Sequence, residues 1–302
     1  MHILATEGLT KRFPTVTAVD RLTVTVGSGV TGLVGANGAG KSTLIKILLG
    51  LLPPSEGVAR VLDLDVTARG AEIRRLVGYM PEHECLPPDV SATELVVHLA
   101  RISGLPRTAA RERAADVLRH VGLAEERYRP IGGYSTGMRQ RVKLAQALVH
   151  DPKLVFLDEP TNGLDPRGRD EMLTLIRRIG TEFGISVLVT SHLLGELERI
   201  CDHVIVIDGG RLLRSSAISE FTQATQTVTV EVEDGLESLA RRLSETGQTV
   251  SQQGRLLVVK VVGPETYDAV RDAAADLDLC LIRLEQGRHR IEDVFREEAA
   301  SV

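Results

Sequence analysis

The chemistry most visible in the sequence belongs to a glycine-rich segment that ends in a lysine and two hydroxyl residues. It lies between an apolar stretch and a helical pattern and reads Gly35, Ala36, Asn37, Gly38, Ala39, Gly40, Lys41, Ser42 and Thr43. Glycines let backbone N–H groups turn inward, and the positive end of the following helix attracts anions. Lys41 supplies an ammonium group for the outer phosphates, and Ser42 a hydroxyl for Mg²⁺. The segment therefore predicts a phosphate-binding loop, with a chance glycine-rich turn as the alternative.

Two acidic residues follow a second apolar stretch. Residues 154–157 are all apolar, and Asp158 and Glu159 come directly after them. Ligands of open α/β sheets bind at the carboxyl ends of the strands. Asp158 is suited to hold Mg²⁺ together with Ser42, and Glu159 to polarise the water that attacks a γ-phosphate. A simple acidic turn at a strand end is the alternative for this pair taken alone.

Short apolar runs predict the strands that position these residues. They are apolar on both faces, as in strands of a parallel sheet that is covered by helices. The runs are residues 32–34, 154–157, 187–189 and 204–207. We expect an α/β domain with a mainly parallel sheet over residues 1–218.

Strand patterns disappear between residues 90 and 150. Ser91 and Glu94 form a capping-box pattern that opens a helix, and a helical pattern also covers residues 109–121. We therefore expect a helical subdomain at about residues 88–150, inserted into the sheet.

The pattern changes again after Arg214. Residues 227–232 alternate between polar and apolar side chains, which is typical of a half-buried strand. The later expected elements are helices at residues 236–245 and 267–275 and strands at residues 248–251, 256–262 and 279–284. This order predicts a small α+β domain of the ferredoxin-like βαββαβ type at residues 219–302.

Composition limits the classes of partner. The chain has 43% hydrophobic and 25% charged residues and a formal charge of -5, so no nucleic-acid partner is expected. No apolar run approaches the ~18 residues of a membrane span. Cys85, Cys201 and Cys280 match no metal or redox spacing and indicate a reducing, cytosolic compartment. If the protein works at a membrane, a partner must supply the spans.

Further motifs make about two thirds of the chain, roughly residues 4–213, resemble the ATP-binding cassette (ABC) family. Residues 133–141 resemble the family's signature segment, and residues 158–165 resemble its second acidic motif and the loop where paired cassettes meet. Thr190, Ser191 and His192 end a strand and resemble its switch-histidine motif. The resemblance implies a phosphate-loop NTPase core that binds and hydrolyses ATP with Mg²⁺.

The resemblance also implies roles for residues outside the phosphate loop. His192 would contact the γ-phosphate, Phe13 would stack on adenine, and Asp165 would lie between paired cassettes. The residues that would close ATP onto the phosphate loop of a second cassette are Ser135, Thr136, Gly137 and Met138. Taken alone, His192 could be a first-turn helix residue, Phe13 an ordinary apolar side chain and Ser135 a helix cap.

Two departures from the family's pattern indicate one branch of it. Glu82 stands where most members have a glutamine that senses Mg²⁺, and a carboxylate still ligates a hard cation. The signature has Tyr134 and Met138 where the family has leucine and glutamine. Both departures resemble cassettes of drug, antibiotic, polysaccharide or sodium exporters. The end of the chain is similar to the tail of that branch and reads Ile291, Glu292, Asp293, Val294 and Phe295.

The resemblance therefore implies an ATPase subunit that drives export through a separate membrane permease. Its partners would be a second cassette, as a homodimer, and the permease, which would hold it at the cytoplasmic face of the cell membrane. A soluble ABC ATPase acting on a macromolecule and the motor of an importer are the alternatives. A phosphate-loop kinase would leave Ser135 and His192 without a role.

Overall fold

The computed structural model describes residues 2–222 and 224–288, and the chain divides into two compact units, Met1–Ile218 and Ser219–Val302. The expected exporter-like tail at residues 291–295 lies outside the described residues. Within the described residues, no helix is both long and apolar enough to cross a lipid bilayer.

A six-stranded sheet forms the centre of the first unit. Its strand order is β10-β9-β3-β8-β7-β6. The bounds are β3 Val30–Val34, β6 Val77–Met80, β7 Leu154–Leu157, β8 Ser186–Ser191, β9 His203–Asp208 and β10 Arg211–Ala217. Neighbours from β9 to β6 pair in parallel, and β10 is antiparallel to β9. The predicted mainly parallel sheet is confirmed.

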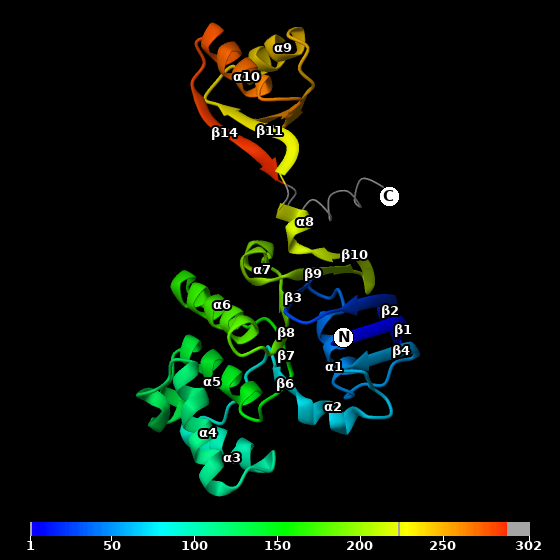
Figure 1. Cartoon of the computed structure of the whole chain (residues 1–302), viewed down its shortest axis with the longest axis vertical. Helices are drawn as coiled ribbons and strands as arrows, with labels where there is room; N and C mark the ends of the chain where they lie inside the picture. The colour runs from blue at the N-terminus through cyan, green and yellow to red at the C-terminus, as the bar shows by residue number, and fades with distance from the viewer. Residues whose placement is uncertain (1, 223, 289–302) are drawn as a thin grey trace. The chain divides into compact units, whose positions relative to one another are not determined.

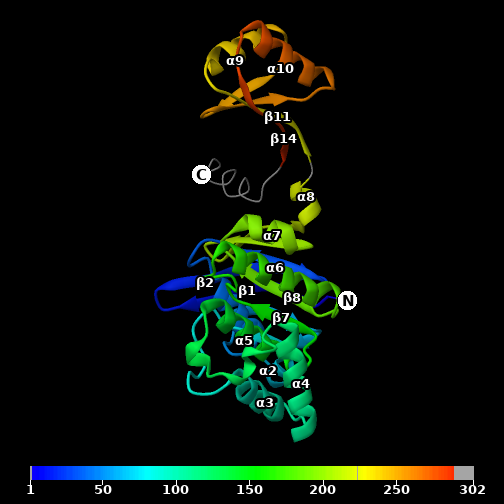
Figure 2. The ribbon, with the colours of Figure 1, turned by 90° about the vertical axis from the view of Figure 1, so that its left-hand side faces the viewer.

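Helices cover both faces of this sheet. Figure 1 shows α5, α6 and α7 on one side and α1 on the other, and Figure 2 shows α6 and α7 from their own side. The bounds are α1 Lys41–Leu48, α2 Gly70–Leu76, α5 Thr136–Leu148, α6 Pro166–Thr181 and α7 Leu194–Ile200. Helix α8, Ile218–Thr222, begins at the last residue of this unit. Strands β7 and β8 are buried along their whole length, because helices and neighbouring strands exclude water from both faces.

A second, antiparallel sheet packs against α1 in the first unit. Its order is β2-β1-β4-β5, with β1 Leu4–Phe13, β2 Val16–Val26, β4 Glu56–Val61 and β5 Leu64–Asp65. Leu9 and Leu22 of this sheet share one buried cluster with Ile45 of α1. The apolar runs named above do not include this sheet. Register shifts after Thr6 interrupt the alternation of apolar side chains in β1, whereas Leu22, Val24 and Val26 of β2 alternate with exposed residues.

The stretch between β6 and β7 is helical, as predicted. It contains α3 Ala92–Ile102, α4 Arg107–His120 and α5, with short 3₁₀ turns at Glu126–Tyr128 and Ile131–Gly133. The predicted capping box opens α3: the Ser91 hydroxyl accepts a bond from Glu94 N, and the Glu94 carboxylate accepts one from Ser91 N.

The second unit has the predicted βαββαβ order. Its elements are β11 Ala224–Val232, α9 Leu236–Glu245, β12 Val250–Gln253, β13 Leu256–Lys260, α10 Glu265–Asp276 and β14 Leu281–Arg288. All neighbours in the order β12-β13-β11-β14 are antiparallel, which is the ferredoxin-like arrangement. Its own core includes Val228, Val230, Leu239, Leu257 and Val270.

Strand β6 and helix α5 approach each other closely at Gly78. A Cβ atom added there would lie 2.0 Å from the carbonyl oxygen of Ala147, so either the strand or the helix would have to move. We expect Gly78→Ala to lower the free energy of unfolding by about 1–3 kcal/mol, the usual cost of overpacking. Calorimetric unfolding of the purified chain measures this change.

Gly195→Ala is the matched control for this substitution. A Cβ added at Gly195, in α7, meets nothing within 4 Å. This variant should be as stable as the wild type or slightly more so, because alanine favours the helix. Equal stability of Gly78→Ala and the wild type would contradict the close packing.

Candidate nucleotide site

The phosphate loop runs from the end of β3 to the start of α1, and two of its glycines are required by close contacts. At Gly40, φ is 100° and an added Cβ would lie 2.1 Å from the carbonyl oxygen of Ala18. At Gly35 an added Cβ would lie 2.5 Å from the carbonyl oxygen of Ile207. The loop is therefore wedged between β2 and β9, with its backbone fixed before any ligand binds.

Lys41, the first residue of α1, lies across this loop. Its ammonium group donates to the carbonyl oxygens of Gly35 at 2.7 Å and Ala36 at 3.3 Å. It also lies 3.8 Å from Glu159 Oε1, and both side chains are buried. The positive charge is thus held at the base of the loop, close to the carboxylate expected to act on water.

A threonine fixes both acids at the end of β7. The Thr190 hydroxyl donates to Asp158 Oδ1 and accepts from the backbone N–H of Glu159, each at 2.8 Å. Glu159 has a φ of 49°, in the left-handed region that non-glycine residues rarely adopt. Such backbone strain is common at functional sites and persists where neighbours hold it in place. Here the hydrogen bond that the Glu159 N–H donates to the Thr190 hydroxyl holds it.

His192 contacts the carboxylate of Glu159. Its Nδ1 lies 2.9 Å from Glu159 Oε2, while half of the histidine side chain is exposed to solvent. The other carboxylate oxygen of Glu159 faces Lys41. Glu159 is thus buried between an ammonium group and an imidazole, an arrangement that can orient a water molecule and receive its proton.

Glu82 reaches the same site from the loop after β6. Its Oε1 accepts a hydrogen bond of 3.3 Å from the side chain of Asn162. Its backbone carbonyl accepts one of 2.9 Å from Lys143, a buried residue of α5. Burial lowers the pKa of that lysine, against the opposing charges of Glu82 and Glu84. The signature-bearing helix is therefore bonded directly to the Glu82 loop.

These groups surround one cavity of about 540 Å³. Its lining residues are Ala18, Asn37, Gly38, Ala39, Gly40, Lys41, Ser42, Thr43, Glu82, Asp158, Glu159, Asn162 and His192. It is lined by the phosphate loop and by Glu82, Asp158 and Glu159, so it suits an anion accompanied by a cation. Among the described residues there is no cluster of three or more His, Cys, Asp and Glu side chains that could hold a metal without such an anion.

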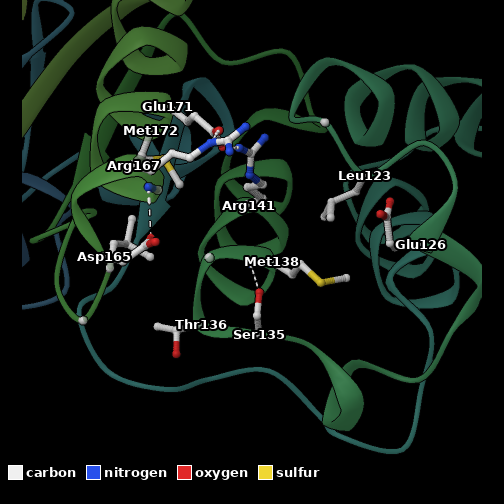
Figure 3. A pocket seen from close by; sticks show the side chains of 15 residues that line it. Leu123, Glu126, Ser135, Thr136, Met138, Arg141, Asp165, Arg167, Glu171 and Met172 are labelled. Carbon is white, nitrogen blue, oxygen red and sulfur yellow. Dashed lines mark hydrogen bonds and ion pairs between the residues drawn. The ribbon is translucent and has the colours of Figure 1, made fainter.

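A second cavity, of about 570 Å³, is lined by the signature residues Ser135, Thr136, Gly137 and Met138. Figure 3 shows Ser135, Thr136 and Met138 at the start of α5 beside Asp165 at the start of α6. Ser135 caps α5 by accepting from Met138 N, and Asp165 caps α6 by accepting from Gly168 N. Except for Gly35 and Phe13, the predicted site residues are therefore divided between the two cavities.

Phe13 lines neither cavity. It ends β1, pairs with Val16 at the tip of the β1–β2 hairpin and is 40% exposed. Lys11 lies over its ring, with Nζ 5.4 Å from the ring centre. From the same pair of strands, Ala18 does line the phosphate cavity.

Sequence reasoning missed three residues that shape the phosphate cavity. They are Ala18, Asn162 and Thr190. Asn162 lies within the acidic motif and Thr190 directly precedes the Ser191-His192 pair, so both were inside recognised segments. A signal for Thr190 was available: a hydroxyl in an otherwise apolar buried strand must find a polar partner. Nothing in the sequence around Ala18 marks it.

The chain is similar to known proteins. A family model described as ABC transporter matches residues 19–162. An uncharacterized ABC transporter ATP-binding protein, YxlF of Bacillus subtilis (strain 168), is 32% identical over 97% of this chain and 98% of its own. Nod factor export ATP-binding protein I of Ralstonia nicotianae is 34% identical over 97% of this chain and 92% of its own. The solved structure of cbiO1 from Clostridium perfringens, part of the ABC transporter complex cbiONQ, is similar with a TM-score of 0.67 and 29% identity over 72% of this chain and 90% of that one.

The position of Lys41 predicts its effect on nucleotide affinity. Lys41→Ala removes the ammonium group at the base of the loop, and we expect ATP affinity to fall by about tenfold or more, because charge-assisted bonds to phosphate are among the strong ones. Titration with a fluorescent ATP analogue measures the change.

Lys46→Ala provides a charge-matched control. Lys46 is an exposed residue of the same helix and lines no part of the cavity. This variant should bind the analogue like the wild type. Equal affinity of Lys41→Ala and Lys46→Ala would rule out the loop as the phosphate site.

Proposed function

Because this chain belongs to the ABC transporter family, as an ATP-binding subunit that hydrolyses ATP, we propose that it drives export through a separate membrane permease. It works as a pair of identical copies bound to the permease at the cytoplasmic face of the membrane. The observation that carries the pairing is the division of the site between two cavities of one chain.

Each cavity has what the other lacks. The phosphate cavity contains Lys41, Asp158 and Glu159 but none of the signature residues. The signature cavity contains Ser135 and Gly137 but no part of the phosphate loop. Two copies arranged head to tail bring the Ser135 hydroxyl of one chain to the terminal phosphate held by the other. Each symmetric pair then has two complete sites.

The oxygen donors in the phosphate cavity suit Mg²⁺. The Ser42 hydroxyl and the Asp158 carboxylate lie on its wall, and Glu82 adds a second carboxylate. Hard oxygen ligands from one or two carboxylates, completed by phosphate and water, are what Mg²⁺ prefers. When bound there, Mg²⁺ offsets charge that develops on the phosphates during hydrolysis.

Hydrolysis in this site depends on positioning and charge. The loop N–H groups and Lys41 hold the triphosphate, while Glu159 orients the attacking water and accepts its proton. The distance of 2.9 Å between His192 and Glu159 supports a role for this histidine beside the γ-phosphate. Loss of the terminal phosphate removes the group that bridges the two copies, so the pair opens.

Support for export comes from the relatives and from the sequence. One relative that matches nearly the whole chain is named for Nod factor export. Glu82 and the Tyr134–Met138 form of the signature resemble the exporter branch. The Glu82 loop, bonded to α5 through Lys143, is the surface we propose for the permease's cytoplasmic loop, because movement there is passed directly to the signature helix.

The role proposed for Glu159 predicts a trapped pair. Glu159→Gln keeps the shape of the side chain but removes the proton acceptor, and steady-state hydrolysis should fall by about 10²-fold or more. ATP binding should persist, and ATP should shift the purified variant to dimers in size-exclusion chromatography with light scattering.

The same substitution at Glu182 is the control. Glu182 pairs with Arg178 on the surface of α6, so Glu182→Gln should hydrolyse ATP at the wild-type rate. Undiminished hydrolysis by Glu159→Gln would refute the catalytic role, and a monomeric variant in saturating ATP would refute the bridging role of the phosphate.

A further inference from the structure

Helix α7 carries a buried carboxylate that the mechanism above does not use. Glu196 is 7% exposed and does not line the phosphate cavity. Its Oε2 accepts hydrogen bonds from the hydroxyls of Thr161 at 2.8 Å and Ser191 at 3.2 Å. Its Oε1 lies 3.0 Å from Nε of Arg169. A buried charge is costly unless it is paired and hydrogen-bonded. Loss of any of these three contacts would therefore destabilise the charged form of Glu196.

The three partners of Glu196 lie on three segments of the nucleotide site. Thr161 follows Glu159 by two residues, and Ser191 directly precedes His192. Arg169 lies in the first turns of α6, where its backbone N–H bonds to the carbonyl of Asp165 at 2.9 Å. Thr161 and Ser191 are themselves buried. One carboxylate therefore joins the water-activating acid, the histidine and the helix capped by Asp165.

We propose that Glu196 is a positioning residue for hydrolysis, which holds the Glu159 and His192 segments in register with the start of α6. Through Arg169 it also links them to Asp165 in the signature cavity, which faces the second copy in the proposed pair. Closure of the pair at Asp165 is thereby transmitted to the Glu159–His192 contact. This inference rests on the roles proposed above for Glu159, His192 and the pairing.

A second ion pair between the same two helices provides a comparison. Arg199 of α7 bonds to Asp170 of α6 at 2.6 Å, but both side chains are 58% exposed. Solvent screens such a pair, and within the described part of the chain no hydrogen bond or ion pair joins the side chain of either residue to the segments of Glu159 or His192. If hydrolysis needed only a link between α6 and α7, loss of either ion pair, Arg169–Glu196 or Arg199–Asp170, would lower its rate. The proposed role predicts an effect for Glu196 alone.

The primary test is Glu196→Gln in the full chain, with Arg199→Ala as control. Glutamine keeps the volume, but its single carbonyl oxygen cannot serve both hydroxyls and Arg169. We expect kcat to fall by about tenfold or more while KM and the affinity for an ATP analogue change by less than about twofold, the pattern of lost transition-state positioning. Arg199→Ala should match the wild type. Wild-type kcat in Glu196→Gln, or an equal loss of kcat and of analogue binding, would overturn the proposal.

A double-mutant cycle with His192→Ala tests whether Glu196 acts through the histidine segment. If it does, adding Glu196→Gln to His192→Ala lowers kcat by less than about twofold, because coupled residues are not additive. If Glu196→Gln lowers kcat as much in His192→Ala as it does in the wild type, the positioning role of Glu196 is contradicted, while the role proposed for His192 is not. Wild-type turnover by His192→Ala would instead contradict the proposed role of His192, and this proposal with it.

Thr161 offers a second route if Glu196→Gln does not fold. Thr161→Val removes the hydroxyl that donates to Glu196 and keeps the shape, whereas Thr161→Ser keeps the hydroxyl. We expect the valine variant to lose kcat and the serine variant to retain it. Equal activity of the two variants would overturn the proposal.

Discussion

The register of three parallel strands determines where the chemistry of this chain lies. Val34 of β3 pairs with Ser191 of β8, and Leu157 of β7 pairs with Val189 of β8. The phosphate loop, the two acids and the histidine therefore leave the sheet at one edge, although more than a hundred residues separate the first from the last. Burial of these strands on both faces stabilises that register, because a slip would expose apolar side chains and separate the loop from the acids.

This sheet edge brings together the phosphate loop, the acids and His192, but not the signature residues that the proposed mechanism also needs. The signature segment begins a helix that crosses to β6 and is bonded to the Glu82 loop through Lys143, so it faces another cavity. In the proposed mechanism, hydrolysis therefore depends on the pairing of two copies. The buried contacts of Glu196 connect the paired surface to the Glu159 and His192 segments. The left-handed backbone of Glu159 fits this account, since a strained catalytic acid needs neighbours on several segments to hold it.

Much of this organisation could be predicted from local patterns. The phosphate loop, the capping box at Ser91 and the βαββαβ order of the second unit depend on neighbouring residues, so short windows of sequence were sufficient for them. The antiparallel sheet of β1, β2, β4 and β5 was missed: register changes after Thr6 interrupt the alternation in β1, although Leu22, Val24 and Val26 of β2 do alternate with exposed residues. Thr190 and Glu196 were also missed. The hydroxyl of Thr190 in a buried strand signalled a polar partner, but the partners of both residues lie on other segments of the chain. Stacking of Phe13 on adenine stays a prediction, because its ring is exposed at the end of β1 and lines neither cavity.

The central claim, that two copies complete each other's site, is tested most directly by mixing two inactive variants. Lys41→Ala lacks the phosphate ligand, and Ser135→Asp places a carboxylate against the incoming phosphate while keeping a residue type that caps α5. Each should hydrolyse ATP poorly alone. Mixed in equal amounts, they should recover about one quarter of the wild-type rate, because half of random pairs are mixed and each mixed pair has one intact site of two. A mixture no more active than the sum of the separate variants would show that one chain forms the whole site and would contradict the account.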